Sequence, residues 1–507
     1  TAPSSSLELL DVATAMPSSL RLESGAVALV TRCAPILQRP AWEAELERPV
    51  RTADYRPRGA DLDALVRLAL PVALVQVGIM AMGVVDTIMV GRVSAMALAA
   101  VAMGHLYFFA VAVFGMGVLF ALDPVISQAV GADDRVGIAR GLQRGMVLAL
   151  ALAIVAMLLL LPAGSFLDAL GQPSEIVPTA ASYARGLIPG VFPFYGFIVL
   201  RQSLQAMARV RVILVVVVAG NLVNVLLNWM LIFGNAGFPA MGAVGSAWAT
   251  SASRWFMMLA LLVAGWPLLK PYLRPLRPEA LAWAPLARLL RVGAPAGGQQ
   301  WLEFGVFGAA GLLMGWMGAL ALASHQVAMQ LAALTFMVPV GIAQATSVLV
   351  GQAVGRGDPQ AARRAAGAGV LVGVGFMTLT ALMFLTLPGP LAAAFSHDAA
   401  VVQAAVLLLP IAGVFQVFDG LQVVASGALR GVGDTRVPML VNLVGFWGIG
   451  LPASAWLGLG LDGGPRGIWW GLALGIGVVG VLLAYRIRRR FGRELRRLVI
   501  DDDTSAT

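Results

Sequence analysis

Residues 212–233 read VILVVVVAGNLVNVLLNWMLIF, an uncharged apolar stretch long enough to cross a bilayer as a single helix. Comparable stretches recur from about residue 62 to residue 487. Of the 507 residues, 59% are apolar and only 12% are charged, and the mean hydropathy is +0.84. This composition excludes a soluble globular enzyme and a disordered protein, and it predicts an all-α integral membrane protein with many spans.

The apolar windows predict twelve transmembrane helices. Their approximate limits are 64–90, 97–130, 143–164, 178–200, 212–233, 243–266, 293–316, 320–354, 366–387, 400–426, 437–457 and 467–486. The second and eighth windows are longer than a perpendicular crossing requires, so these helices must tilt or protrude from the bilayer.

The chain also repeats itself. The sequence QAVG at residues 128–131 recurs at residues 352–355, and Pro71 and Pro295 are separated by the same interval. The sequence NLV at residues 221–223 recurs at 442–444, and Arg209 and Arg430 are separated by that interval too. Landmarks in the same order predict two six-helix halves. Because each half has an even number of spans, their pseudo-symmetry axis runs along the membrane normal.

The predicted domains follow from these spans. They are a polar, disordered cytoplasmic extension at 1–60, a first lobe at 61–266, a cytoplasmic linker at 267–291, a second lobe at 292–490 and a cytoplasmic tail at 491–507. Arginines gather in the loops on one side of the predicted spans and in the tail, which places both termini in the cytoplasm. We expect a multi-pass protein of the inner or plasma membrane. An organelle membrane is the alternative if residues 1–60 are a targeting segment.

Four carboxylates lie well within the predicted spans, where a charge is costly and usually functional. They are Asp86, Asp123, Glu303 and Asp419. Asp123 lies near the cytoplasmic end of the second span, where we expect it to form bonds at a helix–loop junction. The other three are not equivalent under the repeat, which favours functional specialisation of the two halves.

Neutral oxygen-bearing side chains line up on two other spans. Asn221, Asn224 and Asn228 share one helix face, and Ser246 and Thr250 are one turn apart. Oxygen ligands around one carboxylate suit a hard monovalent cation, and a buried carboxylate can equally take a proton. Hydrogen bonding between helices is the alternative for these residues. Asn221 has an equivalent in the second half, so we assign it to packing.

Aromatic and polar side chains also mark the second half. Soft aromatic surfaces accept varied ligands, although in membrane proteins they more often serve packing. Residues 325 and 326 have two interpretations: a structural role, or contact with substrate or a proton. The candidate substrate-cavity residues are Trp301, Phe304, Phe307, His325 and Gln326.

At these residues the chain resembles the multidrug and toxic compound extrusion (MATE) family, and it is most similar to the NorM-type branch. The stretches that carry the resemblance include VDTIMVG at 85–91, LAAV at 98–101, MGAVG at 241–245, and the longer stretches 224–233, 325–355 and 419–431. The similarity covers about residues 62–490. It implies a MATE-like fold of twelve helices in two lobes.

The resemblance also implies a function. Members of this family are secondary antiporters that expel organic, often cationic, compounds in exchange for Na⁺ or H⁺. Asp86, Asn224, Asn228 and Thr250 match the family's cation-coupling cluster in the first lobe, and Ser246 matches a fifth position less closely. Glu303 and Asp419 match the acidic pair of the second lobe. We expect no cofactor apart from the coupling ion, no metal other than Na⁺, no nucleic-acid partner and a monomer in the bilayer.

Two other function classes fit the sequence less well. A flippase for lipid-linked intermediates, as found in the wider superfamily, would need a strongly basic central cavity, whereas the spans here offer mainly acids. A membrane-embedded enzyme would need a clustered nucleophile and base or metal ligands. The sequence provides one cysteine, Cys33, and three scattered histidines, so neither a disulfide nor a zinc site is expected.

Overall fold

The computed structural model describes residues 52–501, and this part of the chain is helical with no strand. The N-lobe contains α4 (Gly59–Gly91), α5 (Ala95–Leu119), α6 (Leu122–Gly131), α7 (Arg135–Leu160), α8 (Ala163–Ala169), α9 (Val177–Gly186), η3 (Ile188–Gly190), α10 (Val191–Ala206), α11 (Val210–Phe233) and α12 (Gly242–Ala264). A short 3₁₀ helix, η2 (Thr52–Tyr55), precedes it.

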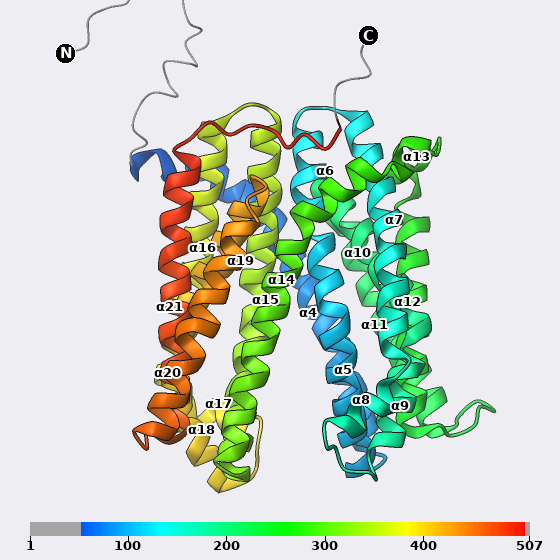
Figure 1. Ribbon diagram of the computed structural model, residues 1–507, viewed down its shortest axis with the longest axis vertical. Helices are drawn as coiled ribbons and strands as arrows, with labels where there is room; N and C mark the ends of the chain where they lie inside the picture. The colour runs from blue at the N-terminus through cyan, green and yellow to red at the C-terminus, as the bar shows by residue number, and fades with distance from the viewer. Residues whose placement is uncertain (1–51, 502–507) are drawn as a thin grey trace, which may run out of the picture. The chain divides into compact units, whose positions relative to one another are not determined.

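The second half forms another bundle of long helices beside the first (Figure 1). After α13 (Trp266–Leu273) and η4 (Pro278–Leu281), the C-lobe contains α14 (Trp283–Trp316), α15 (Ala319–Gly355), α16 (Pro359–Thr386), α17 (Pro388–Ala393), α18 (Ala399–Gly431), α19 (Arg436–Asn442), η5 (Leu443–Gly450), α20 (Leu451–Ala455), η6 (Trp456–Gly460) and α21 (Gly464–Phe491). The predicted linker at 267–291 corresponds to most of α13, η4 and the start of α14. The predicted extension at 1–60 lies mostly outside the described residues.

Eleven helical stretches of residues 52–501 are long and apolar enough to span a membrane. The remaining predicted span is α14, whose mean hydropathy is lowered by Gln299, Gln300 and Glu303. This helix nevertheless packs against α5 and α15, which are two of the spans. The predicted all-α membrane fold is therefore confirmed.

The second span is interrupted where the sequence predicted one long helix. It covers 37 residues, Ala95–Gly131, and breaks at Phe120 and Ala121 between α5 and α6. Pro124 lies in the first turn of α6, where a residue without an N–H group costs little. The equivalent span in the second half, α15, is continuous over the same length, although it contains Pro339.

The two lobes contact each other through helices that the repeat relates. Helix α4 packs against α15, and its repeat equivalent α14 packs against α5, while α6 also contacts α15. The closest approaches lie in the half of these helices nearer the Arg-rich loops, which we call the basic end. Gly117 meets Gly297 there, Gly293 meets Val118, and Gly341 meets Ala73. The lobes are therefore closed against each other at the basic end.

The repeated QAVG sequences form the centre of this closure. A Cβ atom added at Gly131 would overlap the backbone oxygen of Gln352, and one added at Gly355 would overlap that of Gln128. The Gln128 Nε2 donates to the Gly431 carbonyl at 2.9 Å, and the Gln352 Nε2 donates to the Ala206 carbonyl at 2.8 Å. Each glutamine thus binds a backbone carbonyl of the opposite lobe.

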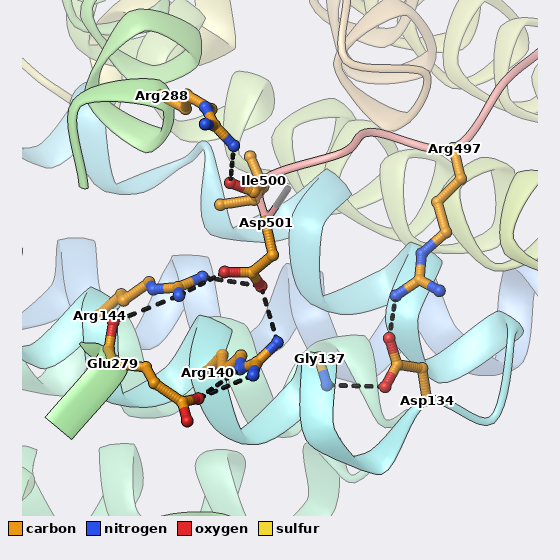
Figure 2. Close-up of polar contacts among 9 residues, drawn as sticks. All are labelled: Asp134, Gly137, Arg140, Arg144, Glu279, Arg288, Arg497, Ile500 and Asp501. Atoms are coloured by element: carbon orange, nitrogen blue, oxygen red, sulfur yellow. Dashed lines mark hydrogen bonds and ion pairs between the residues drawn. The ribbon is translucent and has the colours of Figure 1, made fainter. Parts of the chain in front are cut away.

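The chain after α21 crosses from the C-lobe to the N-lobe (Figure 1). The Leu498 N–H donates to the Gln128 Oε1 at 2.8 Å, and Arg497 pairs with Asp134. Figure 2 shows the end of this segment held by three arginines. Arg144 donates to both oxygens of Asp501, at 2.5 and 3.1 Å. Arg140 lies 3.4 Å from the same carboxylate, and Arg288 donates to the Ile500 carbonyl at 2.7 Å.

The electrostatics of this tail segment depend on pH in a definite direction. Burial opposes ionisation of Asp501, but Arg144 and Arg140 outweigh it and hold the pKa of Asp501 below its usual range. Burial likewise opposes ionisation of Asp134, whose pKa is lowered by the Gly137 N–H and by Arg497. A carboxylate whose pKa is lowered on docking stabilises the docked state at neutral pH. That stabilisation is lost as the pH falls through the lowered pKa values.

We expect Asp501→Asn to loosen the tail segment while leaving the helices folded. The substitution removes the charge that Arg144 and Arg140 bind, and at this partly exposed site the loss is about 1 kcal/mol. The amide of Leu498 should then exchange hydrogen about fivefold faster, as followed by mass spectrometry at neutral pH. Glu494→Gln is the matched control, because Glu494 pairs with Arg496 on the exposed part of the same segment. Equal exchange in Asp501→Asn and wild type would contradict the docking role.

We expect Gly131→Ala to shift the protein away from the state that is closed at the basic end. The added methyl group meets backbone rather than a flexible side chain, and such overpacking costs about 1–3 kcal/mol. Spin labels on α6 and α15 should report a longer distance across the lobes in a larger share of molecules. Gly375→Ala is the control, because a Cβ atom at Gly375 meets nothing. An unchanged distance distribution in Gly131→Ala would refute this role.

Candidate functional site

Three helices of the N-lobe bring the predicted cation-coupling residues together. Helices α4, α11 and α12 pack against one another, and each turns polar side chains toward the other two. Asp86 comes from α4, and the one-turn spacing of the α11 and α12 residues keeps each pair on one helix face. All five side chains are buried: Asp86, Asn224, Asn228, Ser246 and Thr250.

The carboxylate of Asp86 is held by two donors from the other helices. The Asn228 Nδ2 donates to the Asp86 Oδ1 at 2.6 Å, and the Thr250 Oγ1 donates to the Asp86 Oδ2 at 2.8 Å. The Asn228 Nδ2 also lies 3.2 Å from the Asn224 Oδ1. Asp86, Asn224, Asn228 and Thr250 therefore form one cluster, centred on a single carboxylate, while Ser246 lies one turn before Thr250 on the same face of α12.

This cluster leaves polar atoms without a partner. The Asn228 Oδ1, the Ser246 Oγ and the Asn224 Nδ2 are buried and make no hydrogen bond within the described residues. Two of these three atoms are oxygens. The Asn228 Oδ1 and the Asp86 carboxylate offer oxygen ligands of the kind that a hard monovalent cation prefers, and the carboxylate alone can hold a proton. Asn221, in contrast, donates to the Gly78 carbonyl at 2.9 Å and so ties α11 to α4.

One residue near this cluster was not identified from the sequence as part of it. Arg254 lies one turn after Thr250 on α12 and is 7% exposed. Its guanidinium lies 4.4 Å from the centre of the Phe108 ring and 5.0 Å from that of Phe194. The attraction between the positive charge and the aromatic faces offsets part of the free-energy cost of burying the guanidinium. The four-residue spacing between Thr250 and Arg254 was the feature of the sequence that could have placed this arginine on the same helix face.

The C-lobe acids form a second polar site. Glu303 lies on α14 and is partly exposed, whereas Asp419 lies on α18 and is 6% exposed. Gln422, one turn after Asp419 on α18, lies beside Glu303. The Asp419 Oδ1 has no partner within the described residues. This site is thus polar and incompletely satisfied.

The predicted aromatic lining divides into two groups. Phe304 packs against Phe109 of the N-lobe with ring centres 5.5 Å apart, and His105 stacks on Phe109 at 6.1 Å. Trp301 is 48% exposed and lines a cavity of about 330 Å³ with Phe114 and residues of α7. The Phe109–Phe304 contact and the cavity beside Trp301 both lie between helices of the two lobes. His105 and Phe109 were missed from the sequence, because nothing in the sequence alone places α5 opposite α14.

The remaining candidates lie elsewhere. Phe307 packs within the C-lobe, 6.1 Å from Phe415 between ring centres. His325 is buried against Trp469 at 5.6 Å, and its Nδ1 has no partner within the described residues. Gln326 is exposed. The structure therefore brings Phe304 to the face between the lobes, but it places Phe307 and His325 in the core of the C-lobe.

Asp123 differs from the expectation of helix–loop bonding. It is fully buried at the start of α6 and lies 3.5 Å from the guanidinium of Arg430 on α18, in the opposite lobe. The distance fits an ion pair, although neither carboxylate oxygen meets the geometry of a hydrogen bond. Asp123 follows the helix break at Phe120 and Ala121 by two residues, and nothing in the local sequence indicated that partner.

Comparison with known proteins matches most of the chain to one family. The family model MatE matches residues 71–230 and again 295–456. A probable multidrug resistance protein NorM of Mesorhizobium japonicum is 38% identical, covering 85% of this chain and 94% of that protein. The multidrug resistance protein NorM of Burkholderia vietnamiensis is 38% identical over 83% and 92% of the two chains. MdtK of Edwardsiella ictaluri is 34% identical over 84% and 94%.

Solved structures of similar fold are also found. The eukaryotic MATE transporter AtDTX14 has a TM-score of 0.80 and 22% identity, covering 86% of this chain and 98% of that one. A multidrug resistance MATE family transporter in an outward-facing conformation has a TM-score of 0.77 and 20% identity, covering 88% and 99%. At this level of identity the likeness supports the fold alone.

Proposed function

Because this chain belongs to the MatE family, we propose that it is a secondary antiporter that expels organic compounds in exchange for Na⁺ or H⁺. The observation that carries the proposal is the buried cluster around Asp86, in which the neutral side chains of Asn228 and Thr250 donate to the carboxylate and the Asn228 Oδ1 has no partner within the described residues. An intramembrane carboxylate in such surroundings is suited to bind and release a monovalent cation. The relatives named as multidrug resistance proteins support export as the direction of transport.

The orientation follows from the distribution of charge. We place the basic end, with both termini, in the cytoplasm, because positively charged loops are retained on that side. The closure through Gly131, Gly355 and the two glutamines then lies on the cytoplasmic side. A protein closed on the cytoplasmic side is in the state that releases substrate outward and takes up the coupling ion. Separation of the lobes at this end would give the opposite state.

Ion binding at Asp86 supplies the link between the gradient and this motion. Neutralising the carboxylate changes how α4, α11 and α12 pack, because Asn228 and Thr250 now donate to it as an anion. The ion drives transport only if it binds one state more tightly than the other, since equal affinity shifts nothing. The coupling residue must therefore titrate or bind its ion within the conformational cycle.

The substrate site lies between the lobes. Phe304 and Phe109 form an aromatic contact across the lobes, with His105 stacked on Phe109 within α5. Trp301, on the same helix as Phe304, is half exposed and lines a cavity. Aromatic faces attract organic cations, and amphiphilic compounds match such a surface. Glu303 and Asp419 add negative charge on the C-lobe side. We propose small cationic or amphiphilic compounds as substrates of a monomeric transporter.

We expect Asp86→Asn to abolish gradient-driven export without abolishing substrate binding. The amide keeps the size of the side chain but carries no charge to bind an ion. Asn228→Ala should reduce export severalfold, because the carboxylate remains while its 2.6 Å hydrogen bond is lost. Ethidium export should be measured from proteoliposomes under a sodium gradient alone and then under a pH gradient alone. Ethidium binding in detergent should be measured in parallel.

Asp63→Asn is the matched control for this experiment. Asp63 lies on the same helix but is exposed and pairs with Arg67 one turn away. Its substitution should leave export unchanged. If wild-type protein fails to export under either gradient, the antiporter proposal is wrong. If Asp86→Asn exports at the wild-type rate, the coupling site lies elsewhere.

We expect Glu303→Gln and Asp419→Asn each to lower ethidium export at least tenfold while the protein still reaches the membrane. Each change keeps the side-chain shape and removes a charge that has no other explanation in the apolar interior. Export assays in cells, with surface labelling to measure the amount inserted, test this, and Asp63→Asn again serves as control. Full export by both variants would assign these acids a structural role only.

A further inference from the structure

Arg430 joins the two lobes through its guanidinium. It lies in the last turn of α18 and is 8% exposed. Two groups of the N-lobe hold it: Asp123 at 3.5 Å, and the ring of Phe120 with its centre at 4.9 Å. The next residue, Gly431, accepts a hydrogen bond from Gln128. Every one of these contacts crosses between the lobes, so all of them must break when the basic end opens.

Arg430 also ends a polar row along α18. Asp419, Gln422 and Ser426 precede it at spacings of three or four residues, which keeps all four on one helix face. A side chain of α14 reaches this row, since the Gln299 Nε2 donates to the Ser426 Oγ at 3.1 Å. Glu303 lies one turn further along α14, beside Gln422.

The direction of the arginine side chain connects this row to the acids. Helical side chains tilt toward the N-terminus of their helix, which for Arg430 is the direction of Ser426 and Asp419. Arg430 and Glu303 flank the Gln299–Ser426 hydrogen bond, each one helical turn away from it along its own helix. Arg430 thus has an acid in each lobe: Asp123 as a direct partner, and Glu303 at a longer range.

We propose that Arg430 is a charge switch that ties the cation occupancy of Glu303 to the closure of the basic end. While the lobes are closed, Asp123 neutralises the guanidinium, and Glu303 with Asp419 retains a bound cation. When the lobes separate, Asp123 moves away with the N-lobe, and the unpaired guanidinium disfavours a cation at Glu303. Release therefore occurs on the cytoplasmic side. This inference rests on the proposed function and orientation.

The sign of this effect determines which cation can bind at Glu303, the coupling ion or the exported organic cation. A coupling ion must leave toward the cytoplasm, and a freed positive charge promotes that step. An exported organic cation must instead be bound from the cytoplasm, and the same charge would oppose its binding. The switch therefore requires a coupling cation at Glu303 and Asp419, the acidic pair that the resemblance already marks, in addition to the one at Asp86, and it leaves the aromatic contact around Phe304 to the substrate.

The test measures how readily coupling cations displace a substrate. Ethidium is bound to the purified full-length protein in detergent, and Na⁺ at fixed pH, or acid without Na⁺, is titrated until half of the dye is released. A unit charge at about 10 Å in a medium of effective dielectric constant about 20 changes binding roughly tenfold. Arg430→Gln should therefore lower the half-displacing cation concentration roughly tenfold. Asp123→Asn, which frees the guanidinium, should raise it.

Three further variants separate this switch from structural damage. Arg430→Lys keeps the charge and should behave as wild type. Arg209 is the repeat equivalent of Arg430 but is exposed, so Arg209→Gln should have no effect. In a Glu303→Gln background, Arg430→Gln should cause no further shift, because the coupled partner is absent.

The outcomes distinguish failure of the charge switch from failure of the antiporter proposal. Shifts of opposite sign in Arg430→Gln and Asp123→Asn support the switch. Shifts of the same sign, no shift, or a shift that persists in the Glu303→Gln background overturn it while leaving the antiporter proposal intact. If neither cation displaces ethidium from wild-type protein and proteoliposomes do not exchange, both proposals fail.

Discussion

A carboxylate inside a bilayer is stable only where other groups replace the water it has lost. Asp86 imposes this requirement on the N-lobe. Its two oxygens are met by Asn228 from α11 and Thr250 from α12, so three helices must pack with these faces turned inward. The same requirement explains why the polar residues of α11 fall on one stripe of an otherwise apolar helix. Packing and ion binding thus depend on one set of side chains.

The contacts between the lobes follow a different rule. Within lipid, helices gain little from hydrophobic burial against one another, so close backbone approach and hydrogen bonds hold them together. At the basic end this takes the form of glycine against backbone, at Gly131, Gly355 and Gly297, with two glutamines bound to carbonyls of the opposite lobe. Such contacts form or break as a set. An interface of this kind favours two discrete arrangements over a continuum.

Much of this fold was predictable because membranes restrict the choices. Long uncharged stretches must be helices, and the QAVG and NLV repeats by themselves indicated two halves. The one-turn spacings predicted that Asn224 and Asn228 share a face. The break between α5 and α6, the Asp123–Arg430 pair and the position of Phe109 against Phe304 were not predictable. Each depends on which helix of one lobe faces which helix of the other, and local sequence carries no such information.

The comparison of the two halves shows where symmetry ends. The residues that close the lobes are repeated, so closure is built from the same backbone geometry twice. The acids are not repeated: Asp86 lies on α4, whereas Glu303 and Asp419 lie on α14 and α18. Arg209 and Arg430 occupy equivalent positions, yet the first is exposed and the second is buried against Asp123. Polar side chains precede the arginine in both halves, Arg201 and Gln205 before Arg209 and Gln422 and Ser426 before Arg430, but only in the C-lobe does this row begin at a carboxylate, Asp419. The repeated glycine and glutamine contacts therefore close two lobes that differ chemically. The closing motion depends on residues that are repeated, and ion and substrate binding depend on residues that are not.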